Sequence, residues 1–273
     1  MSTLLEPFAY GYMRDAIWVC ALVGATCAFL SAFLMLRGWS LVGDALSHAV
    51  VPGVAGAYIL GLPFALGAFL SGGLAAGAML LLSERSGLKS DTVIGVIFTG
   101  FFGLGLFMAS VSPAPVDLQT IALGNVLAIS PGDRLQVVIV SGVTLAVLAL
   151  KWRDLLAVSF DPAHARAVGL DPRLWNAVLF TLLAAAAVAA MQTVGAFLVV
   201  ALVVTPGATA YLLTERFGHL IVLAVAIGAG SAALGAYLSY FLDGATGGVI
   251  VVLQTLLFAL AFLFAPTHGI LRR

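Results

Sequence analysis

Two side chains that could bind a metal ion lie four residues apart in an otherwise apolar stretch. Asp44 and His48 belong to the segment Arg37-Gly-Trp-Ser-Leu-Val-Gly-Asp-Ala-Leu-Ser-His-Ala-Val-Val-Pro-Gly53. In a helix, residues spaced i and i+4 project from the same face, so the carboxylate and the imidazole point the same way. One carboxylate oxygen and one imidazole nitrogen suit a divalent cation of borderline hardness: Mn²⁺, Fe²⁺ or Zn²⁺. The pair therefore predicts a metal site.

The composition indicates a helical membrane protein. Of the 273 residues, 62% are hydrophobic and 9% are charged, whereas a soluble domain normally carries about 25% charged residues. The 12 basic residues only balance the 12 acidic ones, so no positive excess is present to neutralise nucleic-acid phosphates. These numbers exclude a soluble enzyme and a nucleic-acid binder. We predict an all-α, polytopic chain in contact with membrane lipid, with residues 1–273 forming a single transmembrane domain.

A membrane helix needs about 20 apolar residues. Breaks at charges, Gly and Pro predict about nine such spans, or eight, with one boundary near Gln192 and Thr193. We expect residues 117–133 to be a helical element that dips into the outer interface. The expected spans lie near residues 16–36, 39–60, 63–82, 92–110, 134–150, 174–191, 194–213, 219–241 and 248–265.

The basic residues predict the orientation of these spans. Only Arg14 and Arg134 fall on one side, and the other ten basic residues fall on the opposite side. The positive-inside rule then places the ten in the cytoplasm and the N-terminus outside, in a multi-pass protein of the cytoplasmic (inner) membrane. The expected cytoplasmic parts are the loops at residues 37–38, 83–90, 151–173 and 214–218 and the C-terminus.

Small residues recur at a spacing of four in three of the expected spans. Close backbone approach must supply much of the contact energy between helices in lipid, so such rows favour tight packing. The rows are Gly24, Ala28 and Ala32, then Gly73 and Gly77, then Gly228, Ala232 and Ala236.

The metal-binding pair is expected deep in the membrane. If its helix begins near Trp39 at the cytoplasmic face, Asp44 lies roughly 8 Å deep and His48 about 14 Å deep, close to the bilayer centre. Ionisable residues at such depth usually face a bundle interior or a water-filled cavity and are functional by default. The alternative is an Asp–His hydrogen bond that only satisfies two buried polar groups. Pro52 and Gly53 should kink or loosen the helix above the pair.

Two ligands are too few for a tight site. A homodimer whose two-fold axis follows the ion pathway would present two copies of Asp44 and two of His48, four ligands in all. That set is adequate for tetrahedral Zn²⁺, or for Mn²⁺ with added waters.

The longest hydrophilic segment, residues 151–173, contains a short predicted helix. Asp161 followed by Pro162 is typical of an N-cap with proline at the first helical position, and Gly169 is a natural stop. A helix of about two turns is marginal in water alone and needs a surface to dock on. This suits a coupling element that inserts into a soluble subunit, although a plain capped connector fits the same features.

Three motifs resemble one family. The segment from Arg37 to Val54 resembles the signature of permease subunits in the ATP-binding-cassette family that imports manganese, zinc or iron. The segment Phe160-Asp-Pro-x-x-Ala-x-x-x-Gly169 resembles the ATPase-docking helix of that family. The segment from Thr193 to Pro206 resembles the same family and the related cobalamin and siderophore permeases. The similarity covers nearly the whole chain in motif order.

The resemblance implies a homodimeric permease of the cobalamin/siderophore type, two cytoplasmic ATP-binding subunits and an extracytoplasmic metal-binding protein that delivers the ion. It implies that Asp44 and His48 match residues proposed to bind metal in transit. It further implies that Asp161, Pro162, Ala165 and Gly169 dock the ATPase. The metal would be cargo, with no permanently bound cofactor, and ATP hydrolysis would occur on a separate chain, so this chain would not be an enzyme.

The resulting hypothesis is that this chain is the transmembrane subunit of an ATP-driven divalent metal importer, which works by alternating access. The alternative is a secondary transporter or channel for the same ions, driven by a gradient. An intramembrane metalloprotease is rejected, because it requires a His-Glu-x-x-His helix or its equivalent and His48 is the only histidine expected in a span core. An Asp and His pair accepts Mn²⁺, Fe²⁺ and Zn²⁺ alike.

Overall fold

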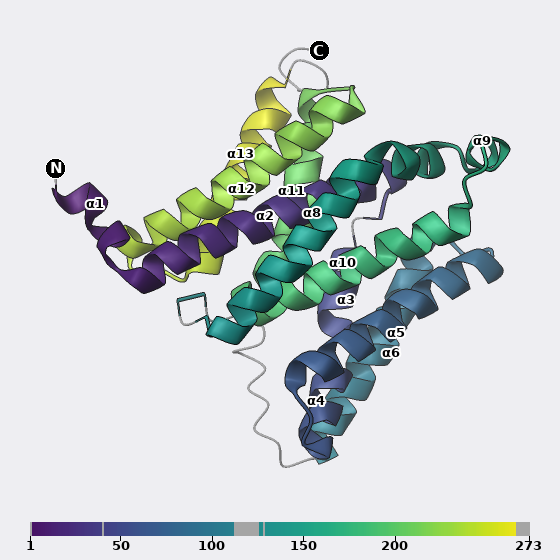
Figure 1. Ribbon diagram of the computed structural model, residues 1–273, viewed down its shortest axis with the longest axis horizontal. Coiled ribbons are helices and arrows are strands. Elements are labelled where there is room, and N and C mark those ends of the chain that lie inside the picture. Colours follow the sequence, from purple (N-terminus) through teal and green to yellow (C-terminus); the bar gives the residue numbers. More distant parts are fainter. Residues whose placement is uncertain (1, 40, 112–125, 128, 266–273) are drawn as a thin grey trace.

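A computed structural model describes residues 2–39, 41–111, 126–127 and 129–265, and within these ranges the regular structure is helical throughout (Figure 1). The prediction of an all-α chain is confirmed. The helices are α1 (Ser2–Ala9), α2 (Gly11–Arg37), α3 (Val42–Ala49), α4 (Val51–Leu60), α5 (Phe64–Arg85), α6 (Ser90–Val111), α8 (Pro131–Phe160), α9 (Pro162–Ala167), α10 (Pro172–Val194), α11 (Ala196–Leu213), α12 (Phe217–Leu242) and α13 (Thr246–Phe264).

Among the described residues, 8 helices are long and apolar enough to cross a membrane: α2, α5, α6, α8, α10, α11, α12 and α13. The remaining expected span, residues 39–60, is present as two short helices, α3 and α4, which meet at Val50. Among the described residues, eight spans are therefore uninterrupted, and a broken ninth segment carries Asp44 and His48. The expected interfacial element at residues 117–133 lies largely outside the described residues.

Two boundaries in the second half of the chain can be compared with expectation. The predicted break near Gln192 and Thr193 is confirmed, because α10 ends at Val194 and α11 begins at Ala196. Gly195 between them has φ 86°, a backbone conformation that glycine adopts without strain. The assignment of residues 151–160 to a loop is wrong, since α8 continues to Phe160.

The centre of the bundle is a close helix pair. A Cβ atom added to Gly24 of α2 would come within 2.5 Å of the Gly228 carbonyl oxygen on α12, and one on Gly228 would come within 2.5 Å of the Ala28 Cβ. Two of the predicted small-residue rows thus face each other at backbone contact. The third row does not pack in this way, because nothing lies within 4 Å of a Cβ at Gly73 or Gly77.

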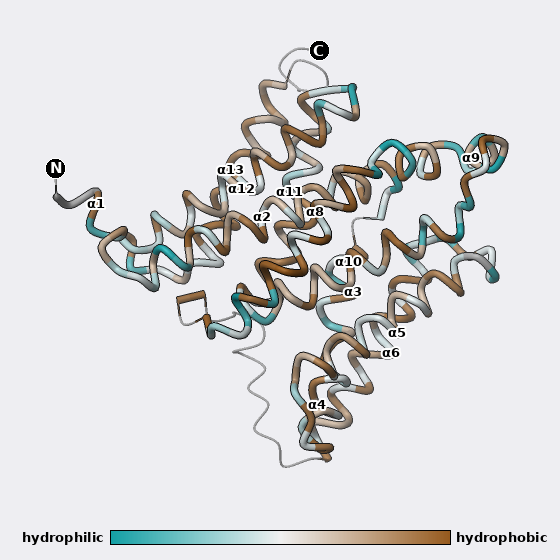
Figure 2. The backbone as a smooth tube through the Cα atoms, viewed as in Figure 1, coloured by the Kyte–Doolittle hydropathy of each residue, from teal (hydrophilic) through white to brown (hydrophobic). Residues whose placement is uncertain are grey.

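The helices α2 and α8 run in the same direction, with ties at both ends. At one end the Arg134 guanidinium lies 2.6 Å from the Asp15 carboxylate, and at the other the Arg37 Nε donates to Ser159 Oγ at 2.9 Å. The hydrophilic stretches gather mainly at helix ends and around α9, while the helix bodies between them are largely hydrophobic (Figure 2). The molecule is therefore built to sit across a lipid bilayer.

Candidate metal site and docking helix

The side chains of Asp44 and His48 meet on α3. The His48 Nε2 lies 3.4 Å from the Asp44 Oδ1, so the helix presents both groups on one face, as their spacing predicts. The helix begins at Val42 and not near Trp39, so the expected start of the helix is wrong. Counted from the start of α3, Asp44 lies about 3 Å and His48 about 9 Å along the helix axis. Asp44 therefore occupies the first turn, where the helix dipole stabilises a carboxylate.

Neither side chain is enclosed by its own chain. The exposed fraction is 38% for the Asp44 side chain and 34% for that of His48. Ionisable groups inside a membrane are placed against protein or water and away from acyl chains. This face of α3 is consequently expected to adjoin either water or another protein surface.

Aromatic rings from α6 support the imidazole. The ring centroids of Phe98 and Phe102 lie 5.5 Å and 5.3 Å from that of His48, and both rings meet it edge to face. The two phenylalanines stack on each other with an interplanar angle of 5°. They form an apolar wall that limits the directions in which the imidazole can turn. The sequence analysis missed this wall, although the i, i+4 spacing of the two rings indicates a common helix face.

The helix is interrupted just beyond His48. Pro52 has no N–H, and its ring cannot tolerate a helical carbonyl four residues earlier, which is that of His48. Ser71 of α5 donates to the Ala49 carbonyl at 2.6 Å, and Gly105 of α6 lies against Val51 and Pro52. The loosening expected from Pro52 and Gly53 is thus observed as an interruption of one residue, Val50, between α3 and α4. The backbone angles of Val50, φ −74° and ψ −26°, remain in the helical region.

No third metal ligand joins the pair from the described residues, since no group of three or more His, Cys, Asp or Glu side chains is near enough to hold an ion. The two cysteines, Cys20 and Cys27, are buried in α2 and unpaired. Among the described residues, Asp44 and His48 are therefore the two candidate ligands at this position.

The predicted cytoplasmic helix is present as α9. The Asp161 carboxylate accepts hydrogen bonds from the amides of Ala163 at 2.9 Å and His164 at 3.0 Å, and these bonds hold the pKa of Asp161 below its usual value. Pro162 is the first helical residue, and the Ala165 side chain is buried. The N-cap assignment is confirmed.

The end of α9 also follows the sequence signal. The helix stops at Ala167, and Gly169 has φ 84°. The amide of Leu170 donates to the Ala165 carbonyl at 2.9 Å, and that of Gly169 donates to the Arg166 carbonyl at 3.1 Å. These two bonds form a Schellman motif, which requires the left-handed conformation that glycine supplies.

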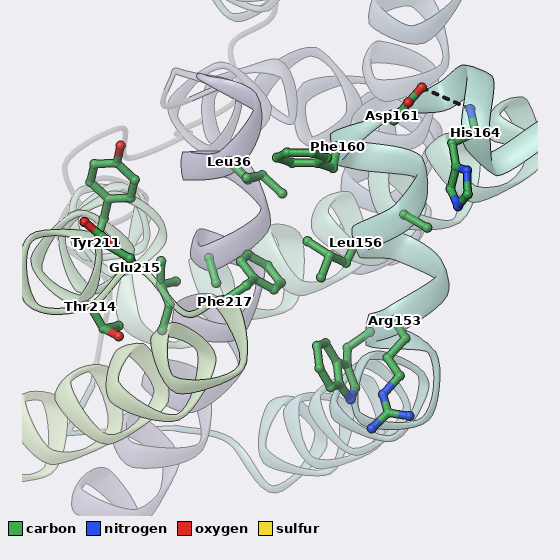
Figure 3. Close-up of a pocket in the computed structure, with 14 residues that line it drawn as sticks. Leu36, Arg153, Leu156, Phe160, Asp161, His164, Tyr211, Thr214, Glu215 and Phe217 are labelled. Carbon is green, nitrogen blue, oxygen red and sulfur yellow. Dashed lines mark hydrogen bonds between the residues drawn. The ribbon is translucent and has the colours of Figure 1, made fainter.

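A cavity of about 600 Å³ opens beside α9, between α8, the end of α2 and the connection from α11 to α12. Figure 3 shows Leu36 and Phe160 next to each other on its wall, with Phe217 close by and with Asp161 and His164 at its α9 edge. The segments 151–173 and 214–218 thus meet at one end of the molecule. The positive-inside rule assigned both to the same side of the membrane.

A comparison of sequences and structures places the chain among known proteins. Residues 9–265 match the model of the ABC 3 transport family. Over 271 residues (99% of this chain and 92% of the relative), the chain is 60% identical to the chelated iron transport system membrane protein YfeC of Yersinia pestis. Over 268 residues (98% and 88%), it is 49% identical to the manganese transport system membrane protein MntB of Synechocystis sp..

A solved structure agrees with these relatives. The chain is similar to a chain of PsaBC from Streptococcus pneumoniae in complex with Fab, with a TM-score of 0.85 and 35% sequence identity, covering 98% of this chain and 97% of the other. The family match and the fold lead to the same conclusion. The chain belongs to the ABC 3 transport family and is a non-catalytic, multi-pass membrane subunit of an ABC transporter.

Proposed function

We propose that this chain forms the ion pathway of an ATP-driven importer of iron or manganese, as a homodimer with Asp44 and His48 of both copies around one ion. The relatives carry iron and manganese in their names, and the pair of donors suits both ions. The ion is cargo, delivered by an extracytoplasmic binding protein and released to the cytoplasm.

One observation carries the proposal. A carboxylate and an imidazole stand together in a membrane helix with about a third of each side chain uncovered, 38% and 34%. Apposition of a second copy across a two-fold axis would cover both groups and bring four ligands together. Four donors satisfy a transition ion, and waters complete the shell of a larger one.

The break between α3 and α4 suits an ion that must be bound and then released. A helix interrupted at Pro52 has fewer backbone hydrogen bonds that resist bending. Interrupted helices are how many transporters line an ion site near mid-membrane. We assign to α3 the motion that opens the site to each side in turn, driven by ATP hydrolysis on the partner subunits.

The ATPase subunits are proposed to dock on α9 through Asp161, Pro162, Ala165 and Gly169 and the surface beside them. Apolar side chains at this hydrophilic end lie open to the surroundings, with Phe160 80% and Val168 58% exposed. Such exposure away from lipid is typical of an interaction surface. A capped helix of six residues also needs a partner to hold it.

The test is metal uptake by cells that express the complete transporter with Asp44→Ala or His48→Ala. We expect uptake to fall to the background of cells lacking the chain, with unchanged membrane insertion and ATPase assembly. His219→Ala is a matched control, because His219 is exposed at the start of α12, a helix that packs mainly on α2, α11 and α13. Wild-type uptake in the Asp44 and His48 variants would leave only a structural role for the pair.

The gradient-driven alternative is tested in proteoliposomes. The ABC family assignment makes ATP the expected energy source. We therefore expect uptake with ATP and none with a non-hydrolysable analogue under the same ion gradient. Equal uptake in both conditions would favour a secondary transporter.

A further inference from the structure

Arg37, at the end of α2, contacts two parts of the chain. One is the connection from α2 to α3, the helix that carries Asp44 and His48, and the other is α8, the helix that leads to α9. The Arg37 Nε donates to Ser159 Oγ of α8 at 2.9 Å. The donor is charged, and the bond joins two helices that are far apart in the sequence. Its guanidinium carbon lies 4.8 Å from the centroid of the Trp39 ring. The side chain is partly buried between these partners.

The contact with Ser159 reaches α9 without a flexible segment between them. Asp161 is at once the last cap of α8 and the first cap of α9. Ser159 lies three residues before Pro162, the first residue of α9, and the single extended residue Asp161 separates the two helices. A displacement of α9 that moves the end of α8 therefore also moves the hydroxyl that Arg37 contacts.

The contact with Trp39 reaches the metal pair by an equally short path. Gly38, with φ 67°, ends α2 in a tight turn, in which the Trp39 amide donates to the Leu34 carbonyl at 2.9 Å. The helix α3 then begins at Val42, and Asp44 is its third residue. The amide of Val42, the first residue of α3, donates to the Trp39 carbonyl at 3.3 Å, so Trp39 is hydrogen-bonded directly to the start of the helix that carries Asp44 and His48.

The second helix that flanks α9 meets the same turn. The Trp39 ring lies 5.0 Å, centroid to centroid, from the ring of Phe180 on α10. The helix α10 follows α9 after a cap in which Asp171 accepts from the Arg173 amide. The helix before α9 and the helix after it, α8 and α10, therefore both contact the turn that contains Arg37 and Trp39.

One donor of the guanidinium is left over. The Arg37 Nη2 is buried and has no hydrogen-bond partner among the described residues. A buried donor without an acceptor costs free energy, which a rearrangement that supplies an acceptor recovers.

We infer that Arg37 is a positioning residue that transmits movement of α9 to α3, through Ser159 on one side and Trp39 on the other. The inference rests on the proposed function, since it assigns a route between ATP hydrolysis and the ion site. It places no metal on Arg37. A route of packed contacts is established only by a measured coupling between its members.

The experiment compares metal ions moved per ATP hydrolysed in proteoliposomes that contain the whole transporter with its metal-loaded binding protein. Ser159→Ala and Arg37→Gln are each expected to lower this ratio about fivefold or more, the lower end of coupling between protein sites. The double variant should lose no more than either single one, because both remove one interaction. Arg37→Lys, which keeps the charge, should recover part of the ratio.

Ser86→Ala is the matched control. The Ser86 hydroxyl donates to the carbonyl four residues earlier at 2.6 Å, as Ser159 does, but it accepts from the Leu88 amide at 3.4 Å where Ser159 accepts from Arg37. An unchanged ratio in Ser159→Ala and Arg37→Gln would overturn the inference, and so would uptake and hydrolysis that fall together with the yield of folded complex. A wild-type transporter that hydrolyses ATP without moving metal would contradict the proposed function instead.

Discussion

Two sets of apolar helices in the bundle differ in how their members pack against one another. The first is the pair α2 and α12, and the second is the group α3, α4 and α6. In the first, glycine and alanine bring two unbroken helices to backbone contact. In the second, a broken helix rests against phenylalanine rings and leaves two ionisable groups a third uncovered. In the most apolar 18-residue stretch of each helix, 72% of the residues of α2 are buried but only 17% of those of α6.

The difference separates a scaffold from a site. Backbone contact leaves no room for a sliding motion, since each atom already has close neighbours. Side chains that meet edge to face across a helix break can shift while they remain in contact. The chain thus concentrates its freedom around Asp44 and His48 and its rigidity around Gly24 and Gly228.

The largest expected effect comes from placing bulk in the scaffold. Gly228→Leu would put a side chain where even a Cβ meets Ala28 at 2.5 Å, so α2 and α12 would have to separate. We expect no folded complex in detergent, measured by size-exclusion chromatography and thermal unfolding. Gly230→Leu, on the same helix with nothing within 4 Å of its Cβ, should fold normally. Equal behaviour of the two variants would contradict the comparison.

The next largest effect is expected from a substitution that stiffens the connection between α3 and α4. Pro52→Ala allows the backbone between α3 and α4 to close its hydrogen bonds, a gain of up to about 3 kcal/mol where a proline interrupts a helix. We expect a higher unfolding temperature and a transport rate reduced severalfold, measured on the same preparation. Pro206→Ala is the control within α11, where Ser31 already donates to the Val204 carbonyl and accepts from the Gly207 amide. Faster transport in Pro52→Ala would refute a hinge at this break.

A smaller effect is expected at the end of α9. Gly169 has φ 84°, which proline cannot adopt because its ring fixes φ near −65°. Gly169→Pro should uncouple ATP hydrolysis from metal uptake while leaving the metal pair intact. Gly87→Pro imposes the same strain at φ 62° between α5 and α6 and should keep coupling closer to wild type. Normal coupling in Gly169→Pro would remove the docking assignment.

The sequence predicts best where one residue type has one structural consequence. Asp161-Pro162 and Gly169 fix the ends of α9 locally, and the run of apolar residues fixes the spans by length. The Asp44–His48 face follows from helical periodicity alone. Each of these needs no knowledge of distant parts of the chain.

Most of the differences depend on tertiary contacts. The start of α3 is a local exception, because Gly38 ends α2 in a turn that includes Trp39, and α3 begins only at Val42. The wall of Phe98 and Phe102 and the bond from Arg37 to Ser159 join residues that are far apart in sequence. Similarly, Gly73 and Gly77 have the spacing of packed rows but face a groove. Spacing shows which residues share a face, and only the assembled bundle shows what that face meets.

The smallest effect concerns the charge of the α9 cap. Backbone amides lower the pKa of Asp161, so the ionised cap stabilises α9 above the usual carboxyl pKa of about 3.9, and this contribution is lost as pH falls through the lower folded value. Asp161→Asn keeps an acceptor without the charge, whereas Asp161→Ala keeps neither. Amide exchange at Ala163 and His164, in lipid nanodiscs and corrected for intrinsic rates, should be slowest in wild type and fastest in Asp161→Ala. Only wild type should lose protection at acidic pH. Protection in wild type that stays constant with pH would show that the hydrogen-bond geometry, and not the charge, holds the helix start.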